Sequence, residues 1–151
     1  MVNYWHCNVQ YEEHQKYMID NKRAHIGLGS DYSGSGEYHY KIRELKPRST
    51  YFQNKKCKDK IKKGDIIFLY QNKIGYTHYG IYNGIIYRNN QTLEDKLPKW
   101  DITEKTDGYC VDEWLIINNP KPDKYALRGT LQEIKNTNKI NRKDIIENLI
   151  L

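Results

Sequence analysis

The sequence predicts an α+β fold, in which a curved, mostly antiparallel β-sheet or small β-barrel is flanked by helices. Two observations predict it. Strand-length runs rich in aromatic and β-branched residues recur through the chain, and the densest of them lies in residues 61–88. Amphipathic helical patterns are confined to two stretches, one near each end of the chain.

Residues 61–88 should form the centre of the core. Three short antiparallel strands are predicted in this stretch, at Ile66–Tyr70, Tyr76–Asn83 and Ile85–Tyr87. A turn signal, Gly64 with Asp65, precedes the first strand, and a strong hairpin signal, Asn83 with Gly84, separates the last two. Because the first strand is a continuous apolar run, it should be buried on both faces.

The chain should begin with a strand over Asn3–Val9 and a helix over Gln10–Lys22. Alternation along the strand sends three apolar side chains toward the core, and these are Trp5, Cys7 and Val9. So aromatic a strand near a chain end is expected to pair in the middle of the sheet. His14 lies on the apolar face of the helix and is expected to be a packed residue.

The remaining elements follow in order. Residues Arg23–Gly36 are interpreted as a glycine-containing segment, small and apolar over Ala24–Gly29 and loop-like over Ser30–Gly36. Residues 89–108 are interpreted as a long polar connection. Further strands are predicted at Glu37–Leu45, Tyr109–Asn118 and Tyr125–Ile134. Residues 1–135 should form a single domain, and residues 136–151 a linker and a short helix packed on it. That helix, Arg142–Leu151, should bury Ile145, Ile146, Leu149 and Ile150.

The chain of 151 residues is basic, with 25 Lys and Arg against 19 Asp and Glu and a net charge of +6. This charge favours an anionic partner, foremost a nucleic acid, either DNA or RNA. A Lys-, Asn- and Ile-rich composition can also follow from an A/T-rich genome, so both interpretations stay open. The basic side chains expected to contact phosphates are Lys41, Arg43, Lys55, Lys56, Lys58 and Lys60, unless residues 54–63 are only a solvated loop.

Several classes of protein are disfavoured by the sequence. No run approaches the ~18 apolar residues that a membrane span requires, and the first residues do not resemble a signal peptide. We therefore expect an intracellular protein, cytoplasmic or nuclear, without a membrane partner. Three scattered cysteines, Cys7, Cys57 and Cys110, argue against a disulfide framework and a zinc site. Neither a metal nor a cofactor is expected.

In the order of these elements the chain resembles the PUA-like superfamily, particularly its EVE and YTH branches. The opening N-Y-W-H-C-N-V before a helix and the segment A-H-I-G-L-G are similar to the start of these folds. The stretch K-K-G-D-I-I-F-L-Y…G-Y-T-H-Y-G-I-Y resembles their core hairpin, and W-L-I-I-N-N-P…L-R-G-T-L-Q-E-I resembles their closing strands. Together these motifs cover most of residues 3–135.

The resemblance implies a binding domain, not an enzyme, with an aromatic pocket for a flipped and modified base. Trp100 matches one pocket wall by position. Ile26-Gly27-Leu28 stands where the family has an indole, so Tyr32 or an aromatic of the Glu37–Leu45 strand would have to replace it. The side chains expected in the pocket are Trp100, Tyr32, Tyr38 and Tyr40, with Asp31 or Asn8 reading the base edge. Arg128 would lie near the nucleic-acid backbone or pin the pocket floor.

Two other functions remain open. The strand around His78 also resembles the histidine strand of papain-like NlpC/P60 and LRAT-type hydrolases, where His78 would be the base and Cys7 or Cys110 the nucleophile. Neither cysteine is predicted at a helix N-terminus, where the thiol pKa would be lowered. A protein-interaction or inhibitor module is the third possibility, because the 14 tyrosines suit a protein interface.

Overall fold

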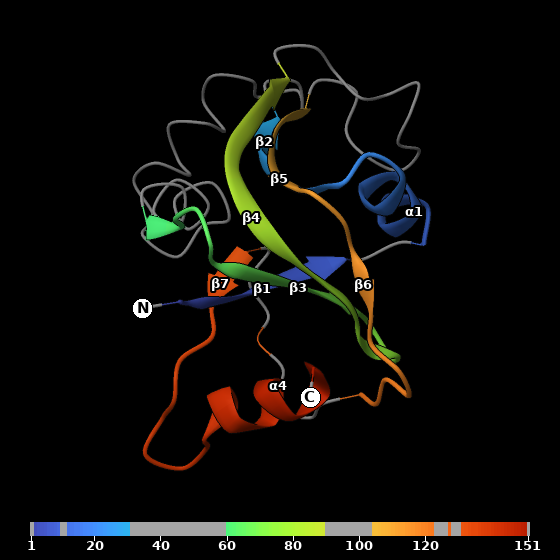
Figure 1. The fold of residues 1–151 in the computed structure, drawn as a ribbon. Helices are drawn as coiled ribbons and strands as arrows, with labels where there is room; N and C mark the ends of the chain where they lie inside the picture. Colours follow the sequence, from blue (N-terminus) through green and yellow to red (C-terminus); the bar gives the residue numbers. More distant parts are fainter. Residues whose placement is uncertain are drawn as a thin grey trace.

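The computed structural model describes residues 2–9, 12–30, 60–89, 104–122, 127 and 131–150. Its elements (Figure 1) are, in chain order, β1 (Tyr4–Val9), α1 (Glu12–Asp20), β2 (Arg23–Ser30), β3 (Ile66–Gln71), β4 (Gly75–Asn89), β5 (Glu104–Val111), β6 (Leu115–Ile116), β7 (Leu131–Glu133) and α4 (Arg142–Ile150). The predicted strand over Glu37–Leu45 lies outside the described residues. No helix in the described ranges is long and apolar enough to cross a membrane.

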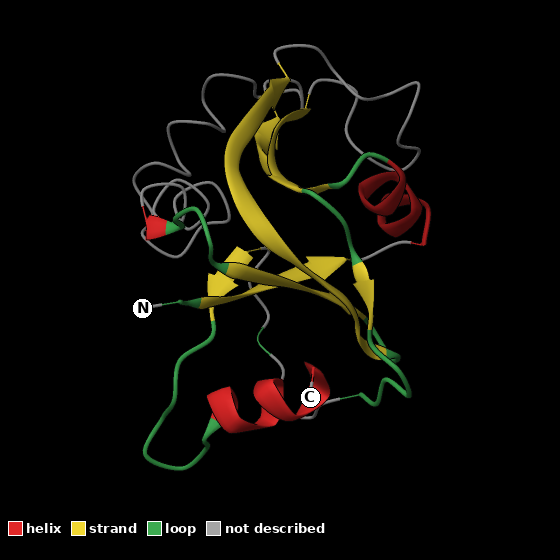
Figure 2. Ribbon diagram, viewed as in Figure 1, coloured by secondary structure: helices red, strands yellow, loops and turns green. Residues whose placement is uncertain are grey.

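The seven strands form one open, curved sheet in the order β2-β5-β4-β3-β1-β7, with β6 paired to β4 (Figure 2). The β1–β3 pair is parallel, and the other recorded pairs are antiparallel. The expected α+β class with a mostly antiparallel sheet is therefore confirmed. β1 lies between β3 and the short edge strand β7, so it is paired on both sides, although it is next to the edge of the sheet and not in its middle as predicted.

Side chains are buried on both faces of the central strands, in two separate clusters. The first cluster joins α1 to one face and includes the three predicted β1 residues, in the set Trp5, Cys7, Val9, Met18, Ala24, Ile61, Ile67, Leu69, Tyr82, Tyr109, Val111 and Leu131. The second lies under α4 and consists of Phe68, Tyr70, Tyr76, Ile117, Ile134 and Ile146. β3 supplies both clusters, which confirms that its apolar run is buried on both faces.

A buried residue, Asp65, links the starts of β1 and β3 to the middle of β4. It is only 3% exposed. Its Oδ2 accepts hydrogen bonds from Trp5 Nε1 at 2.9 Å and from the Lys62 backbone amide at 3.0 Å, while its Oδ1 accepts one from the Asn3 amide at 3.2 Å. The Asp65 carbonyl accepts the Tyr82 amide of β4 at 2.8 Å. The predicted turn before β3 is thus also the point where β1, β3 and β4 are joined.

The predicted hairpin at Asn83 and Gly84 is wrong. β4 runs without interruption from Gly75 to Asn89, and the register against β5 shifts between Tyr82 and Ile86. Gly84 has φ of 90°, the left-handed conformation that a hairpin also uses, but here it forms a bulge. Asn83 stabilises the bulge, because its Oδ1 accepts the Ile85 amide at 3.0 Å.

Other predicted boundaries also change. The glycine-containing segment begins with a strand, Arg23–Ser30, which is paired with β5 and which the sequence pattern did not predict. β5 begins inside the stretch expected to be a polar connection. The predicted strand over Tyr109–Asn118 is divided into the end of β5 and the short β6. In α4, Ile146 is buried as expected, whereas Ile145 is 43% exposed.

We expect Asp65→Ala to lower the free energy of unfolding by about 3 kcal/mol, because it leaves the buried Trp5 indole N–H and two backbone amides without an acceptor. Urea denaturation would measure the loss. Asp20→Ala is the control, since Asp20 forms only an exposed pair with Lys16, and that change should cost less than about 0.5 kcal/mol. Equal losses in the two variants would contradict the role of Asp65.

Candidate functional site

The structure places two of the residues predicted for the nucleic-acid site. Asn8 is half-buried near the end of β1, opposite Tyr70 of β3. Lys60 is exposed and precedes the Asp65 turn, toward the other end of β1, so these two residues do not share a site. The other predicted residues lie outside the described ranges, and they are Trp100, Tyr32, Asp31, Tyr38, Tyr40, Lys41, Arg43, Lys55, Lys56, Lys58 and Arg128.

A group that sequence reasoning missed surrounds Arg23 at the start of β2. We call it the Arg23 cluster, and it consists of Tyr17, Arg23, His25 and Tyr87. The guanidinium carbon of Arg23 lies 3.8 Å from the centroid of the Tyr87 ring and 6.0 Å from that of Tyr17. Arg23 Nη2 also donates to the Tyr17 hydroxyl at 3.5 Å. Aromatic stacking therefore holds a planar cation in one orientation.

The local fold brings these side chains together across three strands. The chain turns after α1 at Lys22, which has φ of 54°, and the Lys22 carbonyl accepts the Val111 amide at 2.9 Å. Gly108 of β5 pairs with His25 of β2 on one side and with Tyr87 of β4 on the other. A Cβ at Gly108 would lie 3.0 Å from His25 Cε1 and 3.2 Å from Arg23 Cδ. The glycine thus leaves room for both side chains to cross β5 toward Tyr87.

The charge of Arg23 has no neutralising partner among the described residues. Among the described residues, the recorded ion pairs join Lys16 to Asp20 and Lys135 to Glu133. Arg23 Nε is buried without a hydrogen-bond partner. Burial and the Arg23 charge together lower the pKa of His25 to about 3, so His25 is neutral at physiological pH. The Arg23 cluster can therefore attract an anionic group through one oriented guanidinium.

An aromatic cluster under α4 has a different character. His6 is fully buried, and its Nδ1 lies 2.7 Å from the Tyr76 hydroxyl oxygen, with which it forms a hydrogen bond. Tyr70 and Tyr76 pack edge to face at 4.9 Å between ring centroids. Burial lowers the pKa of His6 to about 4. Because a ligand from solvent could not reach these rings without opening the fold, we interpret the cluster as packing.

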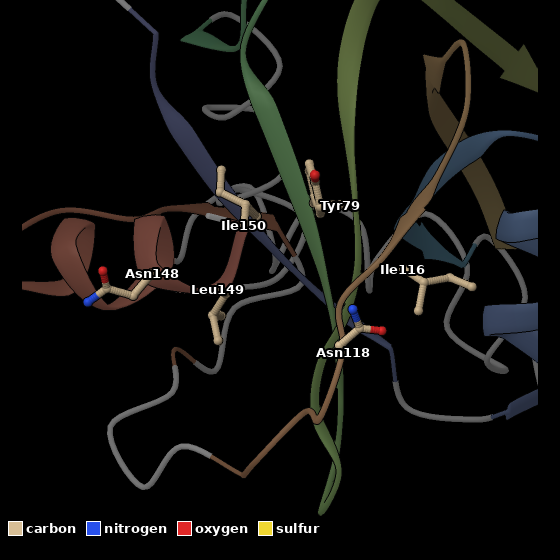
Figure 3. A pocket seen from close by; sticks show the side chains of 6 residues that line it. All are labelled: Tyr79, Ile116, Asn118, Asn148, Leu149 and Ile150. Atoms are coloured by element: carbon tan, nitrogen blue, oxygen red, sulfur yellow. The ribbon is translucent and has the colours of Figure 1, made fainter.

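A pocket of about 370 Å³ lies between the sheet and α4 (Figure 3). Its lining is uncharged and consists of Tyr79, Ile116, Asn118, Asn148, Leu149 and Ile150. The Tyr79 ring is stacked on Phe68, with an interplanar angle of 26°. Two carboxamides beside an oriented aromatic ring can hold a small uncharged polar group, but they offer no charge to a polyanion.

The cysteines proposed as nucleophiles lie in unfavourable surroundings. Cys7 is fully buried, and burial raises its pKa to about 12. The register places Leu69 between Cys7 and His78, which puts these two residues two strand spacings, about 10 Å, apart. The pKa of Cys110 is also raised, mainly by burial. Neither thiol is therefore activated in the described structure.

Comparison with protein-family models finds no match to the chain, and comparison with curated proteins finds no match either. Any role of the Arg23 cluster therefore follows from its own geometry. One signal in the sequence could have revealed it. In R-A-H-I, a strand pattern would place Arg23 and His25 on the same face, opposite the buried Ala24.

We expect the free energy of unfolding to decrease as the pH falls from about 6.5 to about 4. The pKa values of His6 and His25 are lowered to about 4 and about 3 in the folded state. In this pH range the two histidines bind protons in the unfolded chain and remain neutral in the folded chain. Each therefore lowers the free energy of unfolding by up to about 1.4 kcal/mol per pH unit. Below about pH 3 both states are protonated, so this contribution no longer changes.

Urea denaturation between pH 7 and pH 4 measures this slope. His6→Gln should make the slope shallower by part of the histidine contribution, because His25 remains and burial also lowers the pKa of His78. A variant slope equal to that of the parent protein would show that His6 is protonated as easily in the folded state as in the unfolded chain.

Proposed function

We propose that the chain is a PUA-like nucleic-acid-binding domain that accommodates a flipped and modified base between aromatic side chains. The observation that carries the proposal is the oriented Arg23 guanidinium, which has no carboxylate partner among the described residues. A phosphate is the natural partner of such a group, since a planar guanidinium offers parallel N–H donors to two phosphate oxygens. The net charge of +6 supports a polyanionic ligand.

A pocket is supported at the opposite end of β2 from Arg23, where three strand ends lie together. Ser30 of β2 pairs with Glu104 of β5, and Asn89 of β4 pairs with Thr106. Residues 31–59, which carry Asp31 and Tyr32, follow the end of β2. Residues 90–103, which carry Trp100, connect the end of β4 to the start of β5. Both connections therefore leave the sheet at neighbouring strand ends. We propose that Trp100 forms one wall of the pocket and that Tyr32, Tyr38 or Tyr40 forms the other.

The energetics of base flipping explain why aromatic walls would be needed. Unstacking a base costs a few kcal/mol, and stacking on an aromatic ring returns about 1–3 kcal/mol. A phosphate contact from Arg23 would add affinity that does not depend on the base. Base recognition and backbone binding would thus be separate contributions, which can be measured separately.

The test compares Arg23→Gln with Lys139→Gln, which removes the same charge from an exposed position before α4. Fluorescence anisotropy would follow binding to single-stranded 12-nucleotide RNA and DNA, each with and without one N6-methyladenine, at several salt concentrations. We expect Arg23→Gln to weaken binding about tenfold and to reduce the log–log salt slope by about 0.7, as for one lost phosphate contact.

Lys139→Gln should change both quantities much less, because its charge is far from the proposed contact. Arg23→Lys should be intermediate, since it keeps the charge and loses the planar stack on Tyr87. If Arg23→Gln and Lys139→Gln behave alike while both remain folded by thermal melting, Arg23 does not contact the nucleic acid. If the parent protein binds none of the oligonucleotides, the proposed function is wrong.

A further inference from the structure

Three large apolar side chains of β4 are exposed to solvent. Ile81 is 57% exposed, Ile85 is 62% exposed and Tyr87 is 38% exposed. We call these three residues the β4 stripe. Other large apolar side chains are also exposed, Ile116 and Ile145 among them. The three on β4 follow one strand beside basic side chains, and an apolar row of this kind indicates a contact surface.

The three side chains lie on one face of β4. Tyr82 and Ile86 both pack into the first core cluster, so both point toward α1. Their neighbours Ile81, Ile85 and Tyr87 point away from that cluster, because successive side chains of a strand alternate. The bulge between Tyr82 and Ile86 therefore leaves the stripe on one side of the strand. Because Tyr82 pairs with Val111 and Ile86 with Tyr109, the bulge shortens β4 here, and the stripe spans about four strand steps of β5, roughly 13 Å.

Positive charge accompanies the stripe. The Arg23 guanidinium stacks on Tyr87 at one end. The aliphatic part of Lys63 lies against Gly84, since a Cβ added at Gly84 would be 3.3 Å from Lys63 Cβ, and Lys63 itself is exposed. The sequence of β4 contains no acidic residue. The Asp112 carboxylate lies beside this surface and accepts a hydrogen bond from Asn83 at 3.1 Å.

We infer that a single-stranded nucleic acid runs along the β4 stripe, an inference that rests on the proposed function and defines its ligand. Flat base faces cover Ile81, Ile85 and Tyr87, and the phosphates lie beside Arg23 and Lys63. A duplex keeps its base faces stacked inside and offers nothing to the isoleucines. Roughly 13 Å corresponds to about four nucleotides at the ~3.4 Å spacing of a stacked strand, so the stripe contacts several nucleotides besides any flipped base.

The experiment measures the affinity of the full chain for labelled U8, dT8 and a 12-base-pair DNA duplex. The test variant is the double substitution Ile81→Ser with Ile85→Ser, and the matched control is Ile145→Ser on α4, whose side chain is also exposed. Because the replaced side chains are largely in water, all variants should remain folded, which thermal melting checks. We expect the double variant to bind U8 and dT8 at least fivefold more weakly, and Ile145→Ser to bind as the parent does.

A second variant tests the charge of the same surface in the opposite direction. Asp112→Asn removes the nearby carboxylate and keeps an oxygen that can accept from Asn83, and it should strengthen binding of U8 about twofold to fivefold. Loss of affinity in the double variant together with this gain supports the proposed path.

Three results overturn the inference. The path is wrong if the parent protein binds U8 and the double variant binds it equally well, although the proposed function would survive. It is also wrong if the duplex binds more tightly than U8 or dT8. If the double substitution instead breaks up a dimer of the free protein in sedimentation velocity, the stripe is an interface between copies. Failure of the parent protein to bind any oligonucleotide refutes the proposed function itself.

Discussion

The hydrogen bonds of Asp65 determine how the central strands meet. A parallel pair such as β1–β3 has no tight turn to align it, because its strands are joined through a long crossover. Here the Trp5 indole of β1 and the Asn3 amide both donate to the carboxylate that begins β3. A buried carboxylate is tolerated because N–H donors surround it. Its backbone then pairs with Tyr82, so the same residue also aligns β4.

The alignment of β4 determines which residues can serve a ligand. With Tyr82 held against the Asp65 turn, Tyr82 and the following Ile86 fill the first core, and the side chains between and beside them face solvent. The bulge at Gly84 lets one strand leave β3 and continue against β5. Tyr87 thereby reaches the row of Gly108 and stacks beneath Arg23. Core packing and the basic, aromatic surface are consequences of one register.

Sequence patterns predicted the parts of this fold that depend on local chemistry. Alternation in β1 and the continuous apolar run of β3 identified buried faces, because buried positions of a strand are occupied by apolar residues. The Asn83–Gly84 pair was misinterpreted because a hairpin and a bulge use the same left-handed glycine, and only the pairing with β5 distinguishes them. The alternation in R-A-H-I could have placed Arg23 and His25 on one face, but the rest of the Arg23 cluster could not be predicted, since it needs Gly108 and Tyr87 from strands distant in sequence. Most predicted pocket residues, Trp100 among them, lie outside the described ranges and stay predictions.

The central claim is that an extended polyanion binds where Arg23 and the outer face of β4 meet. The most direct test is a two-dimensional ¹H–¹⁵N NMR titration of the labelled protein with U8. We predict that the largest shifts occur at the amides of Arg23, Ile81, Ile85 and Tyr87, and that the amides of α4 barely move. Shifts concentrated on α4 and the pocket beside Asn148, with β4 unaffected, would contradict the claim.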